Sequence, residues 1–304
     1  MLPVAIVIAI GNVLARLSVV TPEGFAQINR AVFWTAIPAL IFRMTSGADL
    51  STLSDGNMVL VVYLSFLLAP PVAWLLGRWS GAAGDRAATS TLMLIRSNTV
   101  FMGLPVVTLA VGQAGVDILS MYVAVTFVGY QIISLWWGTC ALSGGLSWPV
   151  VRSSLKRLAV NPLVVSSVLG FALAVLGWND FPAWVDETLK LLGNVASGMA
   201  LLSLGGSLQV SGIPGMVVRS WRDVALKLLF LPALTWALFL LWPVPPVVLR
   251  TVVLIAAMPV AVDCFILSRV LGMDGDYAAD TIMASTFLSA LTVPLWILLL
   301  DALA

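Results

Sequence analysis

The sequence contains no histidine among its 304 residues, and this absence excludes several chemistries at once. Serine–histidine hydrolysis, haem ligation by histidine and the HExxH metal motif all require that residue. The two cysteines, Cys140 and Cys264, are too few and too widely separated for a zinc motif or a disulfide framework. No glycine-rich phosphate-binding loop of the Walker type is present. We therefore expect no metal, no bound cofactor and no ATP-driven step, and we do not expect an enzyme.

Charged residues are also scarce, at 10% of the chain, whereas 61% of the residues are hydrophobic and the mean hydropathy is +1.06. A net charge of +1 gives no indication of a nucleic acid partner. Apolar runs of about 18 residues or more, long enough to cross a bilayer core, recur along the chain. The first run, from Pro3, has no preceding basic segment and no small-residue cleavage site, so it is predicted to be a mature helix. The composition predicts an all-α, multi-pass integral membrane protein surrounded by lipid.

Ten apolar segments, separated by charged or turn-rich residues, are predicted to be transmembrane helices, with bounds good to about three residues. They lie near residues 3–20, 27–46, 57–77, 88–111, 116–142, 162–178, 188–208, 223–242, 247–270 and 279–302. The longest connection, residues 143–160, divides the chain into a first unit of five spans, 1–142, and a second, 161–304.

The two units resemble each other in sequence. Residues 91–136 align without a gap on residues 251–296, and the identities include a glycine pair, Gly112 with Gly272, and a tryptophan pair, Trp136 with Trp296. Apolar helices match by composition when leucine and alanine coincide, but matched glycine and tryptophan at a constant offset favour a true internal repeat. The sequence therefore predicts two copies of a five-helix unit.

The basic residues predict how these units cross the membrane. Loops after odd-numbered spans carry most of the lysine and arginine, for example Arg78, Arg86 and Lys156, whereas loops after even-numbered spans carry acids such as Asp117 and Glu187. The positive-inside rule places the basic loops in the cytoplasm and both termini outside it. Because each unit holds an odd number of spans, the second must run in the opposite sense to the first. Such inverted repeats are common in secondary transporters.

Polar and helix-breaking residues interrupt the fourth and ninth spans. In the fourth, Asn98 and Thr99 precede Gly103 and Pro105, and in the ninth Pro259 follows an apolar run. Proline removes a helical hydrogen bond, and glycine at Gly103 permits unusual backbone angles. A broken helix exposes unpaired N–H groups and a positive dipole end, which attract an anion. A proline kink packed by small residues would be the structural alternative, but two such breaks favour a substrate site.

Arg96 and Asp263 are expected to be the only charged side chains deep within the spans. A charge at mid-bilayer costs at least about 2.5–3.5 kcal/mol, so such residues usually mark functional sites. Arg96 could hold a substrate carboxylate in a bidentate fork, and Asp263 could bind a coupling proton or sodium ion. The alternative is a structural ion pair between them. Ser97 and Gln131 are further substrate-binding candidates, although Gln131 would also serve as a hydrogen bond between helices.

Five segments together resemble the auxin efflux carrier family, which includes plant auxin carriers and bacterial permeases for malonate, malate and similar carboxylates. They are INRAVFWTAIPALIF (28–42), NTVFMGLPV (98–106), NPLVVSSVLGF (161–171), GMALLSLGGSL (198–208) and MPVAVDCFILSRVLG (258–272). The resemblance implies ten helices divided into a scaffold and a moving transport part, with the fourth and ninth broken and crossing beside the substrate. It further implies a homodimer in a bacterial inner membrane that moves a mono- or dicarboxylate by alternating access.

Three positions depart from the family pattern, and they favour an anion smaller or more highly charged than auxin. Ser97 stands where the plant carriers usually have proline, Asp263 stands near an asparagine of many bacterial relatives, and Arg96 is not part of the pattern. A sodium- or proton-coupled symporter or exchanger of the bile-acid or cation/proton type is the main alternative, although it would usually carry several embedded acids. A channel would need a polar stripe along a pore, and an intramembrane enzyme would need a nucleophile and base within the spans.

Overall fold

The computed structural model describes residues 2–47, 56–144, 152, 156, 159–178, 180–207 and 213–302. Every regular element within these ranges is a helix, and a single bridge joins Ser97 to Val260. The elements are α1 (Leu2–Arg16), α2 (Pro22–Trp34), α3 (Ala36–Ser46), α4 (Gly56–Trp79), α5 (Gly84–Leu94), η2 (Thr99–Gly103), α6 (Leu104–Ala110), α7 (Gln113–Leu142), α9 (Pro162–Val175), α10 (Ala183–Ser207), α11 (Ile213–Ala225), η3 (Leu226–Phe230), α12 (Leu231–Leu241), α13 (Pro246–Ala256), α14 (Asp263–Val270) and α15 (Gly275–Ala302). The predicted connection at 143–160 lies largely outside the described residues.

Five helical segments of the described chain are long and apolar enough to cross a membrane. They are Pro22–Ser46, Gly56–Trp79, Val125–Leu142, Gly215–Leu241 and Gly275–Ala302. Each overlaps a span predicted from the sequence, and the apolar helices Pro162–Val175 and Pro246–Ala256 are shorter. The chain is therefore an all-helical integral membrane protein.

Local sequence explains where several helices begin or bend. Asn161 caps α9 by accepting a hydrogen bond from the Leu163 N–H at 2.9 Å, and Pro162 occupies the first turn, where no N–H is needed. The second predicted span bends at Thr35 into α2 and α3. The bend follows from Pro38, which cannot donate to the carbonyl of Trp34. These local rules set the ends of the helices but not their packing.

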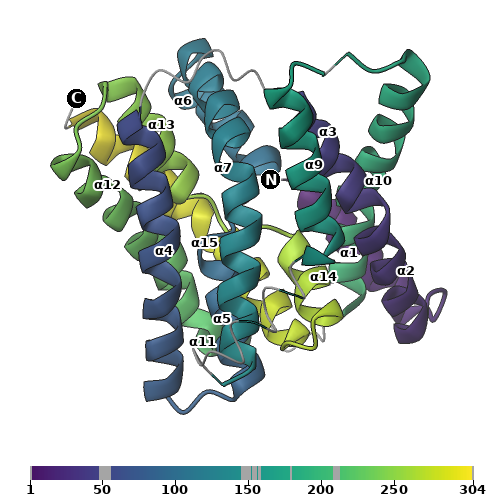
Figure 1. Cartoon of the computed structure of the whole chain (residues 1–304). Coiled ribbons are helices and arrows are strands. Elements are labelled where there is room, and N and C mark those ends of the chain that lie inside the picture. The colour runs from purple at the N-terminus through teal and green to yellow at the C-terminus, as the bar shows by residue number, and fades with distance from the viewer. Residues whose placement is uncertain are drawn as a thin grey trace.

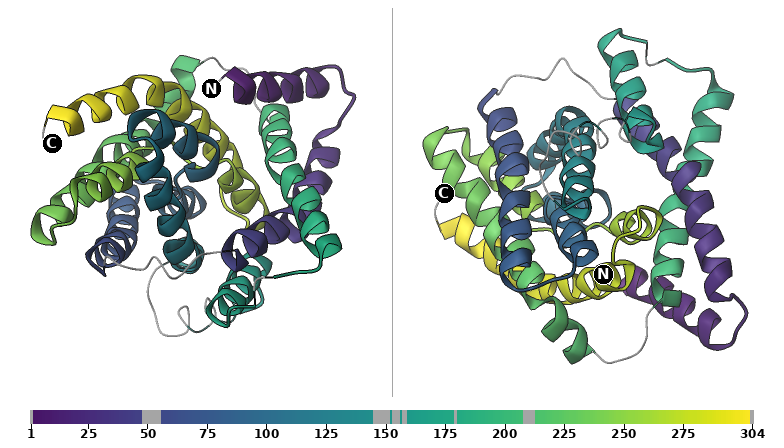
Figure 2. Two further views of the ribbon diagram at one scale, coloured as in Figure 1. Left: turned by 90° about the horizontal axis from the view of Figure 1, so that it is seen from above. Right: turned by 60° about the horizontal axis from the view of Figure 1, so that its bottom comes forward.

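The helices form two groups (Figures 1 and 2). The first group comprises α1, α2, α3, α9 and α10, which pack on one another at the right of Figure 1. The second group comprises α4 to α7, α11 to α13 and α15, at the left, with η2 and η3 within it. The short helix α14 contacts α2 and α10 of the first group and α15 of the second. The groups also meet where α7 packs against α3 and α9, and this boundary contains the candidate site.

Candidate substrate site at two crossing chain breaks

The first break separates α5 from η2 and α6. Residues 95–98 are not helical, and the following turn is a π-helix in which the Gly103 N–H donates to the Asn98 carbonyl at 3.0 Å. The wide turn ends at Gly103, and Pro105, which has no N–H to donate, lies in the first turn of α6. Gly103 does not use the freedom that glycine permits, because its φ of −63° and ψ of −48° are ordinary helical angles. The break at residues 95–98 therefore involves no glycine-specific conformation at Gly103.

The second break, residues 257–262, separates α13 from α14 and lies against the first. The Asn98 N–H donates to the Pro259 carbonyl at 2.8 Å, and the Ala261 N–H donates to the Arg96 carbonyl at 2.9 Å. The Val260 N–H donates to the Ser285 hydroxyl of α15 at 3.2 Å. Exposed backbone polar groups are not tolerated in an apolar environment, so each break satisfies part of the other. The two segments consequently form one crossing unit.

A cavity of about 100 Å³ lies beside the crossing, between the two helix groups. Apolar side chains of α3 line it, including Ile37, Leu40 and Met44. Polar residues of the two breaks, η2, α7 and α14 also line it, with apolar residues such as Val123 and Phe127 among them. These polar residues are called the polar wall here: Ser97, Asn98, Thr99, Tyr122, Thr126, Tyr130, Gln131 and Asp263. A water molecule needs about 10–15 Å³ of such space, so the cavity has room for several waters or a small solute. A mostly apolar pocket with a few convergent polar groups is the usual form of a small-molecule site.

Arg96 lies behind this polar wall, not in it. Its side chain is fully buried, and its guanidinium donates to Asp263 Oδ2 at 2.5 Å and to Gln131 Oε1 and Ser134 Oγ at 2.9 Å each. The guanidinium also stacks over the Tyr130 ring, 4.5 Å from its centre. Arg96 is not among the residues that line the cavity. The ion pair that the sequence left as an alternative is therefore present, and the guanidinium is held by protein groups.

Asp263 faces both Arg96 and the cavity. The Asp263 side chain is 26% exposed, and its Oδ1 has no hydrogen-bond partner among the described residues. Gln131 Nε2, on the same wall, also has no partner within the described chain. Buried polar atoms are normally paired, and both of these atoms are themselves buried. The residues of the wall thus carry one unpaired donor and one unpaired acceptor just beneath the cavity surface, beside a neutralised ion pair.

The remaining predicted site residues occupy different places. Asn98 and Thr99 line the cavity, together with Ser97, whereas Gly103 and Pro259 are not among its described lining residues. Pro105 lies in the first turn of α6, and Pro259 contributes its carbonyl to the Asn98 N–H. These prolines shape the chain that presents the polar wall.

The sequence analysis overlooked Lys227, and its expectation of only two deeply embedded charges was wrong. Lys227 is fully buried within Gly215–Leu241, and Asp223 and Asp280, near the ends of their helices, are also buried. The available signal was the position of Lys227 four residues inside the predicted span 223–242. Averaged hydropathy concealed it, because the surrounding residues are strongly apolar.

An all-helical membrane protein with a mostly apolar cavity, a few polar groups and a pair of crossing chain breaks has the features of a membrane transporter. The family model described as "Membrane transport protein" matches residues 1–140 and 146–297. The chain belongs to this family, the auxin efflux carrier family, and the resemblance seen in the sequence is confirmed.

Relatives with similar sequences extend over nearly the whole chain. An "Uncharacterized transporter" of Methanothermobacter thermautotrophicus is 27% identical over 97% of this chain and 95% of its own length. A protein of Rhizobium meliloti named "Putative malonate transporter" is 25% identical, with 96% and 92% covered. The Arabidopsis thaliana "Auxin efflux carrier component 8" is 22% identical, with 98% and 96% covered. All three names denote carriers, and two of them name a compound, malonate in one and auxin in the other.

Proposed function

We propose that the protein is a secondary carrier, not an enzyme, that moves a small organic carboxylate across the plasma membrane of a bacterium by alternating access. The observation that carries this proposal is the Asn98 side chain at the wall of the cavity, on the crossing of the two breaks. The names of the malonate and auxin relatives support an organic anion as substrate.

The polar wall suits a carboxylate. The amides of Asn98 and Gln131 supply hydrogen-bond donors, and a carboxylate accepts several such bonds. The Thr99 hydroxyl donates to the Ser97 carbonyl and would have to turn to bind the substrate. Asp263 would repel an anion if it stood alone, but its pairing with Arg96 leaves the two side chains neutral together. Hydrogen bonds to charged acceptors are about twice as strong as neutral ones. A dicarboxylate could place one group at Asn98 and reach Gln131 with the other.

The architecture that accompanies this proposal is a pair of inverted five-helix units, ten transmembrane helices in total. In it the first helix group is the scaffold, which would dimerise, and the second group is the part that moves. Support comes from the two similar breaks, from the cavity at the boundary of the groups and from the sequence repeat. The distribution of basic residues places both termini outside the cytoplasm.

A substrate screen tests the proposal directly. The purified protein should show a raised thermal midpoint with at least one short mono- or dicarboxylate, malonate first, because a ligand of the native state stabilises it. Liposomes containing the protein should accumulate the same radiolabelled compound. An equal concentration of the uncharged diamide serves as the control and should have no effect. Failure of every carboxylate in both assays would contradict the function.

Coupling is proposed to run through Asp263, with a proton or a sodium ion as the driving ion. Replacing Asp263 with Asn keeps an oxygen that accepts from Arg96 but removes the carboxylate that binds the ion. The variant should bind its carboxylate and yet show uptake that no longer responds to an imposed pH or sodium gradient. Gradient-driven uptake at the wild-type rate would contradict this role and favour the rival exchanger model with its coupling site elsewhere.

A further inference from the structure

Lys227 is a buried lysine that contacts the first chain break but takes no part in the ion pair of Arg96 and Asp263. It lies in η3, the π-helical turn between α11 and α12, and its side chain has no exposed surface. A buried ammonium ion is costly unless its donors are matched by acceptors. The burial of this charge therefore needs compensating contacts.

The ammonium group is held by the first chain break. Its Nζ donates to the Leu94 carbonyl at 3.2 Å and to the Ser97 hydroxyl at 2.6 Å. Leu94 is the last residue of α5, so the ammonium lies at the negative end of that helix dipole, where carbonyls lack helical partners. Lys227 thus binds to the chain break itself, one residue before Asn98.

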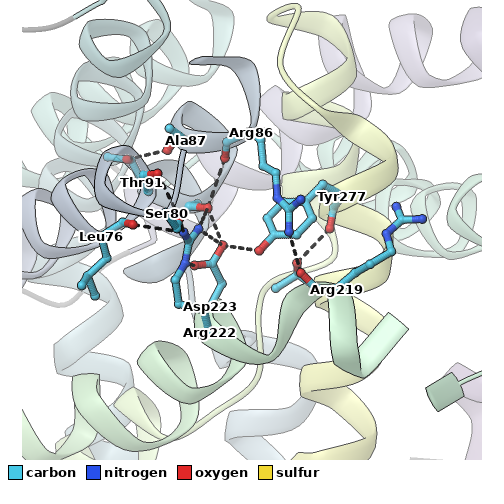
Figure 3. Close-up of polar contacts among 12 residues, drawn as sticks. Leu76, Ser80, Arg86, Ala87, Thr91, Arg219, Arg222, Asp223 and Tyr277 are labelled. Carbon is cyan, nitrogen blue, oxygen red and sulfur yellow. Dashed lines mark hydrogen bonds and ion pairs between the residues drawn. The ribbon is translucent and has the colours of Figure 1, made fainter. Parts of the chain in front are cut away.

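No carboxylate of the described chain forms an ion pair with Lys227. Asp223, one turn earlier, is the nearest acid along the helix, and its oxygens are engaged elsewhere. Figure 3 shows Asp223 between Arg222 and Tyr277, which donate to it at 2.9 Å and 2.7 Å. Ser90 of α5 donates to the same carboxylate. The small space that Asp223 and Lys227 share has no room for a water molecule. The partners of the ammonium are therefore the neutral oxygens of the break.

Such oxygens form the kind of site that binds a metal cation in other carriers. Half-helix C-terminal ends and unwound carbonyls are the groups that coordinate sodium ions or protons in secondary transporters. Here the lysine ammonium satisfies them through hydrogen bonds and fills the space. A free sodium ion would find the Leu94 and Ser97 oxygens already occupied by the ammonium, and the space beside Leu94 and Lys227 is too small for a water molecule.

We propose that Lys227 is a tethered cation that takes the place of a bound sodium ion at the crossing, so that substrate binding and transport need no sodium. The inference rests on the proposed function and identifies Lys227 as a positioning residue. It acts through Ser97, which both accepts from the ammonium and lines the cavity next to Asn98. Of the two coupling ions proposed for Asp263, this leaves the proton.

The test removes the Lys227 side chain and then supplies its ammonium group as a separate molecule. Lys227→Ala deletes a fragment equivalent to propylammonium, and Lys227→Met fills most of the space without a charge. In choline chloride, both variants should bind malonate about tenfold or more weakly than wild type, because the break loses its cation. Propylammonium should restore binding to Lys227→Ala only. Tetramethylammonium, which has the charge but no N–H donor, should restore neither. Lys190→Ala is the control, since Lys190 is an exposed lysine paired with Glu187.

Any one of three results would overturn the proposal. The first is malonate binding by wild type that requires sodium. The others are malonate binding by Lys227→Met as tight as that of wild type, and malonate binding by Lys227→Ala that propylammonium does not change. The first measurement needs no variant, so it stands even if both substitutions prevent folding. Propylammonium should also raise the thermal midpoint of Lys227→Ala with no carboxylate present, and should leave that of wild type unchanged. That readout separates failure of the cation site from failure of the carboxylate function.

Discussion

Replacing Asp263 with Leu is expected to lower the free energy of unfolding by about 3–5 kcal/mol, because it leaves a buried arginine without its counter-charge. Arg96 has no exposed surface, and a guanidinium does not lose its proton in proteins. The reciprocal change, Arg96→Leu, should cost less. The carboxylate left unpaired has a side chain that is 26% exposed and lines a cavity with room for water. We therefore expect the two single substitutions to lower the free energy of unfolding by unequal amounts, with Asp263→Leu the more costly.

The double variant Arg96→Leu with Asp263→Leu should recover much of the loss, since it removes both charges together. Recovery should be incomplete, because Gln131 and Ser134 lose the donor they share. Unfolding of the purified protein in detergent, with all four members of the cycle compared, measures the coupling. The exposed pair Arg43 and Asp186 is the matched control, and its cycle should give at most about 1 kcal/mol. Equal, small losses in both cycles would show that the buried pair is not structural.

Asn98→Ala is expected to weaken carboxylate binding by about tenfold to a hundredfold, the loss associated with one or two hydrogen bonds to a charged acceptor. The fold should be unaffected. The crossing is built from the backbone N–H and carbonyl of Asn98, which alanine retains, and the side chain caps no helix. Isothermal titration of malonate, or of whichever carboxylate the screen identifies, measures the change.

Asn57→Ala is the matched control for this prediction. Asn57 lies in α4, and its amide donates to the Pro243 carbonyl, away from the cavity. It should alter stability slightly and affinity not at all. If Asn98→Ala binds as tightly as wild type and keeps its thermal midpoint, the substrate site does not lie at the crossing.

Composition and local pattern determined the class of protein and the positions of its helices. Hydrophobic runs of membrane-spanning length follow from chain chemistry alone, because in lipid every backbone polar group must be satisfied within a helix. Pro105 and Pro259 predicted the breaks for the same local reason, and Asn98, Thr99 and Asp263 were identified because polar groups are rare within such runs. The family motifs added the expectation that the breaks cross.

The tertiary structure decided which side chains meet. Arg96 and Asp263 are far apart in the sequence, and only the antiparallel contact of the two breaks brings the guanidinium to the carboxylate and away from the cavity wall. Lys227 was not singled out from the sequence, and only the tertiary structure shows its ammonium group bound to Leu94 and Ser97. Gly103 permits unusual backbone angles, but in the π-turn of η2 it has helical ones. Partners across a crossing depend on the register of two distant segments, which no local pattern encodes.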